Sequence, residues 1–251
     1  MLEYVKWFSI PINKSSYRCS LFHLFCFYIR MTTPFRLAKP YDKHHTYDRL
    51  VSIGHSCNNA LQLQILGIKQ ETLPFDWVIC TPDIILDCVE NGFDNYTNFE
   101  TSLPYKSDVF NINSKCTDDL RRNYYGMRFN HDTEDTDEQL IAKYTRRAER
   151  FKAILNSKEK VVFVFSAEVC IFRHDLYTKQ AFYHAFIVKF SDTLVRLFPD
   201  LNFHIIAINL NISFPDTEKI ANINVLWDEL TRSTGDFRLI VRALFKGMFM
   251  S

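Results

Sequence analysis

Apolar residues follow two patterns along this chain, short continuous runs and helical spacing. The continuous runs predict buried strands at 48–53, 160–166 and 202–209, with a shorter strand at 224–227. Apolar residues at helical spacing predict helices at 58–68, 82–91, 134–156, 180–198 and 237–248. Strands and helices therefore alternate, which is typical of an α/β protein.

The alternation predicts how the chain is organised. We predict a single α/β domain over residues 47–251, with a mostly parallel sheet flanked by helices in a Rossmann-like layering. Residues 93–120 are rich in polar side chains and predict a loop. Residues 123–130 are expected to form a strand or one arm of a hairpin.

Residues 1–46 differ from the rest and are expected to be a poorly ordered N-terminal extension. Their one apolar stretch, 20–29, is too short to span a bilayer and lacks the small-residue cleavage site of a secretory signal. We therefore expect no secretion. We also expect the folded domain to begin near Tyr47, so that residues 1–30 are dispensable for folding.

Composition narrows the class of protein. The 251 residues include 30 Lys+Arg and 29 Asp+Glu, for a formal net charge of +1, and 47% are hydrophobic. This excludes a disordered chain and disfavours a nucleic-acid partner. The seven cysteines contain no CxxC pair, which disfavours a disulfide framework and a zinc site. We expect a cytoplasmic, reducing compartment, and neither a metal nor another cofactor.

Cys57 is the candidate nucleophile. It lies at the predicted start of the helix over 58–68, and a helix N-terminus favours the reactive thiolate. The other interpretation is a cysteine that only packs in a strand–helix turn. His131 is the best candidate base, and His55 is a rival. His174, His184 and His204 are expected to be structural.

A catalytic histidine needs a third group to orient it. Asp132 is adjacent, but successive side chains on a strand point to opposite faces, so Asp76 and Glu168 are better candidates. Asp76 lies in the compact sequence PFDW, where Phe75 and Trp77 could equally be packing residues around a turn. Four residues are candidates for substrate binding: His55, Ser56, Trp77 and Asp132.

Five motifs resemble one family. They are S-I-G-x-x-C (52–57), L-Q-x-x-x-L-G (61–67), P-F-D-W (74–77), N-x-Y-G-x-x-F-x-H-D (123–132) and Y-x-R-R-x-x-R-F (144–151). Together they resemble DUF1796, a family of bacteria and large DNA viruses described as putative papain-like cysteine peptidases. The resemblance covers about residues 48–210. It implies a hydrolase, peptidase or deamidase-like, acting on a peptide or protein with Cys57 as nucleophile and His131 as base. It also makes a papain-like core the alternative architecture.

Two other classes of function stay open. An α/β group-transferase or SGNH-like hydrolase would use a pocket at the carboxyl ends of the strands. Cys57 would then be dispensable. A non-catalytic interaction domain would keep the scaffold with Cys57 buried and His131 turned away.

Overall fold

The structure is a computed structural model of the 251-residue chain. It describes residues 47–54, 57–99, 123–129, 131–166, 176–210 and 213–225, and six positions between 241 and 248. The chain separates into two compact units, Met1–Arg36 and Leu37–Ser251, and every described residue belongs to the second. The predicted extension over 1–46 and the loop residues 100–122 lie outside the described residues.

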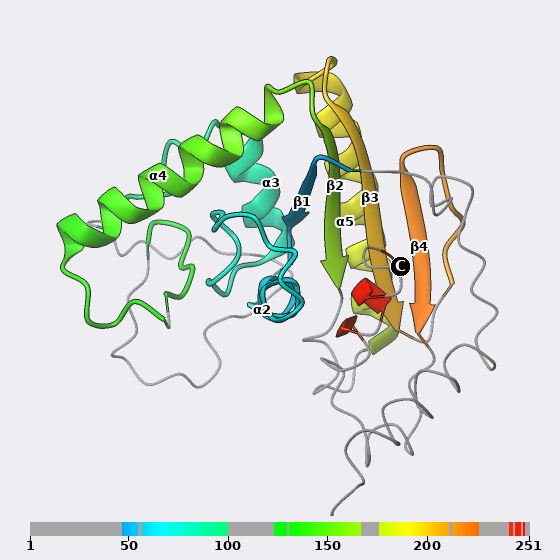
Figure 1. The fold of residues 1–251 in the computed structure, drawn as a ribbon, viewed down its shortest axis with the longest axis horizontal. Coiled ribbons are helices and arrows are strands. Elements are labelled where there is room, and N and C mark those ends of the chain that lie inside the picture. Colours follow the sequence, from blue (N-terminus) through cyan, green and yellow to red (C-terminus); the bar gives the residue numbers. More distant parts are fainter. Residues whose placement is uncertain are drawn as a thin grey trace, which may run out of the picture. The chain divides into compact units, whose positions relative to one another are not determined.

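The centre of this unit is a four-stranded sheet. Its strands are β1 (Arg49–Ser52), β2 (Lys160–Ser166), β3 (Asn202–Leu210) and β4 (Ile220–Val225). They are hydrogen-bonded in the order β1-β2-β3-β4, and all three pairs are parallel (Figure 1). The predicted α/β class and parallel sheet are confirmed. The last strand begins earlier than predicted, at Ile220.

Helices fill the connections between the strands. The β1–β2 connection contains α2 (Asn58–Ile65), α3 (Pro82–Glu90) and α4 (Asp137–Leu155), and the β2–β3 connection contains α5 (Leu176–Leu197). Helix α5 runs along one face of the sheet, behind β2 and β3 in Figure 1. The described positions between 241 and 248 are helical, as predicted. In the described part of the chain, no helix combines the length and apolarity that crossing a membrane requires.

The central strands β2 and β3 are buried on both faces, which explains their continuous apolar runs. Val51, Phe163, Ile205 and Ile220 stand side by side in register and belong to the main core. Alternate residues project to the opposite face. These are also buried, as Val162, Val164, Ile206 and Ile208 show. A strand covered on both sides has no polar face, so it lacks the alternation of a half-exposed strand.

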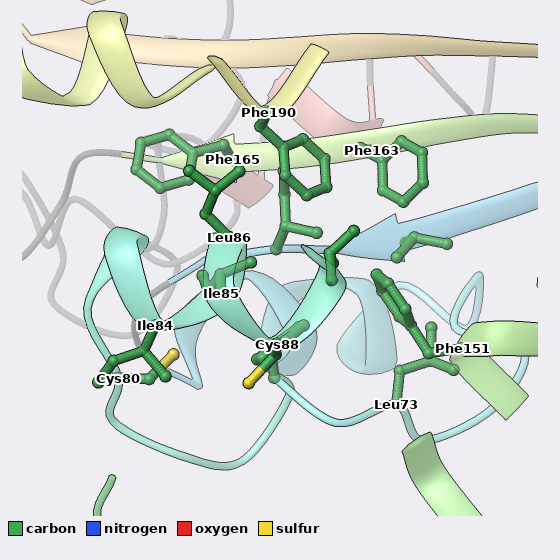
Figure 2. Packing of buried hydrophobic residues seen from close by; sticks show 14 of the residues in the cluster. Leu73, Cys80, Ile84, Ile85, Leu86, Cys88, Phe151, Phe163, Phe165 and Phe190 are labelled. Carbon is green, nitrogen blue, oxygen red and sulfur yellow. The ribbon is translucent and has the colours of Figure 1, made fainter. Parts of the chain in front are cut away.

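Aromatic rings join the β1–β2 connection to the sheet. Phe151 of α4 lies 6.2 Å from the ring of Phe163 on β2, and Phe163 lies 5.5 Å from Phe190 of α5. Phe75 and Phe93 each lie 5.6 Å from Phe151. Figure 2 shows α3 packed on the same core, with Leu86 directed toward the rings of the strands.

Three helix boundaries differ clearly from the prediction: α5 begins at Leu176 instead of 180, and the other two differences have local causes. Helix α2 ends at Ile65 instead of 68, because Gly67 takes a positive φ of 71° and its N–H bonds back to the Gln64 carbonyl. Helix α4 begins at Asp137 instead of 134. Thr136 and Gln139 form a reciprocal capping box there, with bonds of 2.8 and 3.3 Å.

The strand predicted over 123–130 is wrong. The Asn123 side chain accepts hydrogen bonds from the backbone N–H groups of Tyr125 and Met127, both at 3.1 Å, and so folds the segment into a turn. Gly126 supports the turn with a φ of 72°. What remains of the strand is an isolated antiparallel bridge between Arg128 and Ile79.

Phe163 offers a test of the core. Phe163→Ala removes a fully buried ring that contacts other rings on both sides, so we expect unfolding free energy to fall by about 3–5 kcal/mol. Val195→Ala, at a side chain that is 52% exposed, is the control and should cost roughly 0.5 kcal/mol or less. Urea unfolding measures both. Equal losses would contradict this account of the core.

Candidate active site

Cys57 stands at the junction between sheet and helix. It is the N-cap residue of α2, shortly after the carboxyl end of β1, and is partly exposed. Its carbonyl accepts the first intrahelical bond from Leu61 at 2.9 Å, while its side chain makes no capping bond. The first turn of α2 contains no acidic residue. The helix dipole and the amides of that turn therefore favour a thiolate at this position.

Two other thiols differ sharply from Cys57. Cys80 and Cys88 are buried in the main core. Burial raises the pKa of both thiols well above the ordinary value, which keeps them protonated and unreactive. Among the thiols that the structure describes, Cys57 is therefore the one in a setting suited to nucleophilic chemistry.

Helix α2 is anchored to the carboxyl edge of the sheet. Asn59 donates to the Val164 carbonyl at 3.3 Å and accepts from the Ser166 hydroxyl at 2.7 Å. Arg242 of the C-terminal segment donates to Gln62 at 2.7 Å. These bonds fix the start of α2, and with it Cys57, relative to β2.

The transferase hypothesis needs a ligand pocket at the carboxyl ends of the strands, where these hydrogen bonds lie. Ser166 is buried and is used to hold Asn59. Asn209, at the end of β3, is also buried and donates to Asn222 at 3.0 Å. Both polar groups are thus occupied within the protein, which gives no support to a ligand site built on them.

Asp76 forms a buried ion pair. Its carboxylate lies 2.7 Å from the Lys69 ammonium and accepts from the Leu73 N–H at 2.6 Å, and the side chains of Lys69 and Asp76 are only 9% and 1% exposed. Burial raises the pKa of Asp76, and the Lys69 charge opposes that rise. Phe75 is a core residue, so the PFDW segment combines packing with an internal charge pair.

His131 is exposed and packs against Trp77. The centroids of the two rings are 5.6 Å apart, with the planes inclined at 72°. Trp77 is partly exposed, and the Lys69 ammonium lies 5.8 Å from its ring centroid. The PFDW segment and the turn before α4 therefore meet at His131.

Asp132 points into the protein and bonds to α4. It accepts from the Tyr144 hydroxyl at 2.6 Å and from the Lys143 ammonium at 2.9 Å, and Lys143 also pairs with Asp135. Burial opposes the ionisation of Asp132, but these two hydrogen bonds outweigh it and lower the pKa below its ordinary value. Asp132 thus anchors the backbone next to His131 as an ionised carboxylate.

Lys69, Tyr144 and Arg147 also belong to this cluster, although no site role was predicted for them from the sequence. The Arg147 guanidinium lies 4.4 Å from the Tyr144 ring centroid, and its charge favours ionisation of both Asp76 and Asp132. From its neighbours in sequence, Arg147 would be placed on a solvated face of α4. Its spacing of three residues from the buried Tyr144 was the signal that could have placed it inward.

The structure brings some of the predicted site residues together. Trp77 contacts His131, and each of the two has an aspartate as its neighbour in sequence, Asp76 and Asp132. Within the described ranges, neither carboxylate forms a hydrogen bond with the imidazole, because both bond to other residues. Nor is a hydrogen bond recorded there between the Cys57 thiol and His131. Three further candidates, His55, Ser56 and Glu168, lie outside the described residues.

Two further histidines, His184 and His204, lie in regular secondary structure and contact aromatic rings. His184 lies on α5 and stacks on Phe214 at 3.9 Å, and His204 lies on β3 with its ring 6.0 Å from that of Tyr47. Their places in a helix and a strand are as predicted, and His174 is outside the described residues. Among the described residues, no group of His, Cys, Asp and Glu could hold a metal ion.

Asp132 gives the fold a pH-dependent component. Since its pKa is lower in the folded than in the unfolded chain, its contribution to stability is present above the unfolded pKa near 4 and is lost as the pH falls through the folded pKa. We expect Asp132→Asn to lower the unfolding free energy by about 1–3 kcal/mol at pH 6. The difference from wild type should shrink below about pH 4.

Urea unfolding of both proteins between pH 2 and pH 6 measures this, with the exposed Asp94→Asn as control. If the difference in unfolding free energy between wild type and Asp132→Asn stays constant across that pH range, Asp132 does not stabilise the fold as an ionised carboxylate.

Comparison with known proteins gives the chain a family. Residues 48–212 match DUF1796, described as "Putative papain-like cysteine peptidase". Uncharacterized protein R408 of Acanthamoeba polyphaga mimivirus is 33% identical over 133 residues, which are 45% of this chain and 59% of that relative. The match thus spans less than two thirds of the relative's length. No solved structure matches the chain. Because the family match covers more than half of the residues, including Cys57, Trp77 and His131, the chain belongs to the DUF1796 family.

Proposed function

We propose that this protein is a cysteine hydrolase, peptidase or deamidase-like, that acts on an amide bond of a peptide or protein. Cys57 is the nucleophile and His131 the general base. The observation that carries the proposal is the position of Cys57, partly exposed at the N-cap of α2, where the first turn of the helix contains no acidic residue. The description of the family points to the same chemistry.

The reaction has two stages. His131 takes the proton of the Cys57 thiol, and the sulfur attacks the carbonyl carbon of the amide. The C–N bond breaks, the nitrogen leaves as an amine or ammonia with the proton from His131, and a thioester remains. Water then attacks the thioester with His131 as base, which releases the carboxylic acid and regenerates the thiol.

The contacts around the other candidate site residues suggest their roles in this reaction. Asp132 is buried and bonded to α4, so we place it as an anchor of the backbone at His131 and no longer as a substrate contact. Trp77, partly exposed beside His131, remains a substrate-contacting candidate. His55 and Ser56, just before Cys57, and Glu168, as an orienting group, stay predictions. A thiol nucleophile also favours a reducing compartment such as the cytoplasm.

Thiol labelling tests the proposal. We expect an electrophilic probe at pH 6 to label Cys57 about tenfold faster than Cys80 or Cys88, because, of these three described thiols, Cys57 alone occupies a helix N-cap and the other two are buried. His131→Ala should slow labelling of Cys57 by about tenfold or more. Peptide mass mapping assigns each modified cysteine.

The matched control is His184→Asn, which removes an imidazole on α5. It should leave the labelling rate of Cys57 unchanged. If Cys57 labels no faster than the buried thiols, or is indifferent to the loss of His131, the Cys–His assignment is wrong.

A further inference from the structure

The His131 ring is supported by an aromatic side chain. Within the described residues, the contact recorded for this ring is with Trp77, at 5.6 Å between centroids. The carboxylates nearest to it in sequence are committed elsewhere, Asp76 to Lys69 and Asp132 to Lys143 and Tyr144. The indole is therefore the neighbour through which the fold can orient the imidazole.

The ammonium of Lys69 lies beside the indole. It stands 5.8 Å from the Trp77 ring centroid and is itself fixed by three hydrogen-bonding partners. They are the Asp76 carboxylate at 2.7 Å, the Glu71 carbonyl at 2.6 Å and the Thr72 hydroxyl at 3.3 Å. An ammonium has three donors, so these partners use all of them and leave the cation little freedom.

The burial of this cation is informative. Lys69 is only 9% exposed, which is rare for a lysine unless it is paired. The pair with Asp76 also holds the backbone that leads directly to Trp77, because Asp76 accepts from the Leu73 N–H at 2.6 Å. One buried ion pair thus fixes both the segment that carries the indole and the cation beside the indole.

We propose that Lys69 is a positioning residue for the Cys57–His131 reaction, acting through Trp77 to hold the His131 imidazole. The role in the reaction rests on the proposed function. The linkage from Lys69 through Trp77 to His131 is a property of the fold and is tested separately.

The test must separate positioning from simple neutralisation of Asp76. Lys69→Met alone would leave a buried carboxylate unpaired and could unfold the protein. The double variant Lys69→Met with Asp76→Asn removes both charges and keeps an acceptor for the Leu73 N–H. Lys69→Gln is the second variant, since it keeps N–H donors for Asp76 but lacks the cation.

The readout is the NMR signal of the His131 ring protons, which the nearby indole shifts through its ring current. His131→Ala identifies the signals, and Trp77→Leu gives their position without the indole. In the Lys69 variants we expect the signals to move at least halfway from the wild-type position toward that of Trp77→Leu. Lys152→Met, at a surface lysine of α4 paired with Glu149, is the control and should leave them in place.

Labelling of Cys57 supplies the second readout. In the Lys69 variants we expect its rate at pH 6 to fall by about tenfold, because a displaced base transfers protons poorly. If the His131 signals stay at their wild-type position in both folded variants, the inference is wrong and Lys69 serves only to neutralise Asp76. If the signals move but the labelling rate of Cys57 is the same in the Lys69 variants and in His131→Ala as in wild type, the linkage from Lys69 through Trp77 to His131 is supported and the proposed Cys–His function is wrong.

Discussion

Burial of aromatic rings between the sheet and the β1–β2 connection is the interaction on which the rest of the structure depends. That connection carries Cys57, Trp77 and His131, and it is far longer than the helix that joins β2 to β3. A segment of this length has a large conformational entropy to lose on ordering. The contacts of Phe151 with Phe75 on one side and Phe163 on the other offset that loss, and they pack the connection against the sheet.

The pKa values of the two buried carboxylates near the candidate site, Asp76 and Asp132, shift in opposite directions. Asp76 is so deeply buried that its pKa rises although Lys69 lies beside it, whereas two hydrogen-bond donors from α4 lower the pKa of Asp132. Arg147 favours the ionised form of both. Removing one partner of such a pair costs far more than the pair contributes in net stability. Breaking either set of contacts would therefore leave a buried carboxylate uncompensated, Asp76 in the segment that carries Trp77 and Asp132 next to His131.

Much of the fold could be predicted from the sequence because its signals are local. The apolar runs of β2 and β3, and the Thr81–Pro82 start of α3, indicate their structures without reference to the rest of the chain. The turn at Asn123 was missed because aromatic and apolar residues around it resemble a strand, while the side-chain bonds that fold it appear only in three dimensions. Lys69 was missed for a similar reason, because the pattern of hydrophobic positions does not predict which polar groups a lysine contacts.

We take the family description "papain-like" to refer to a type of chemistry, since the fold of this chain is built on a parallel sheet. Function resides in the site and not in the fold that carries it, and Cys–His chemistry occurs on unrelated scaffolds. Here the thiol follows a short strand and begins a helix at the carboxyl edge of a parallel sheet, the edge at which α/β proteins bind their ligands. The polar groups Ser166 and Asn209 at that edge are occupied by Asn59 and Asn222. Among the described residues of that edge, Cys57 is partly exposed, and the rate at which its thiol reacts decides between the proposed hydrolase and an inert scaffold.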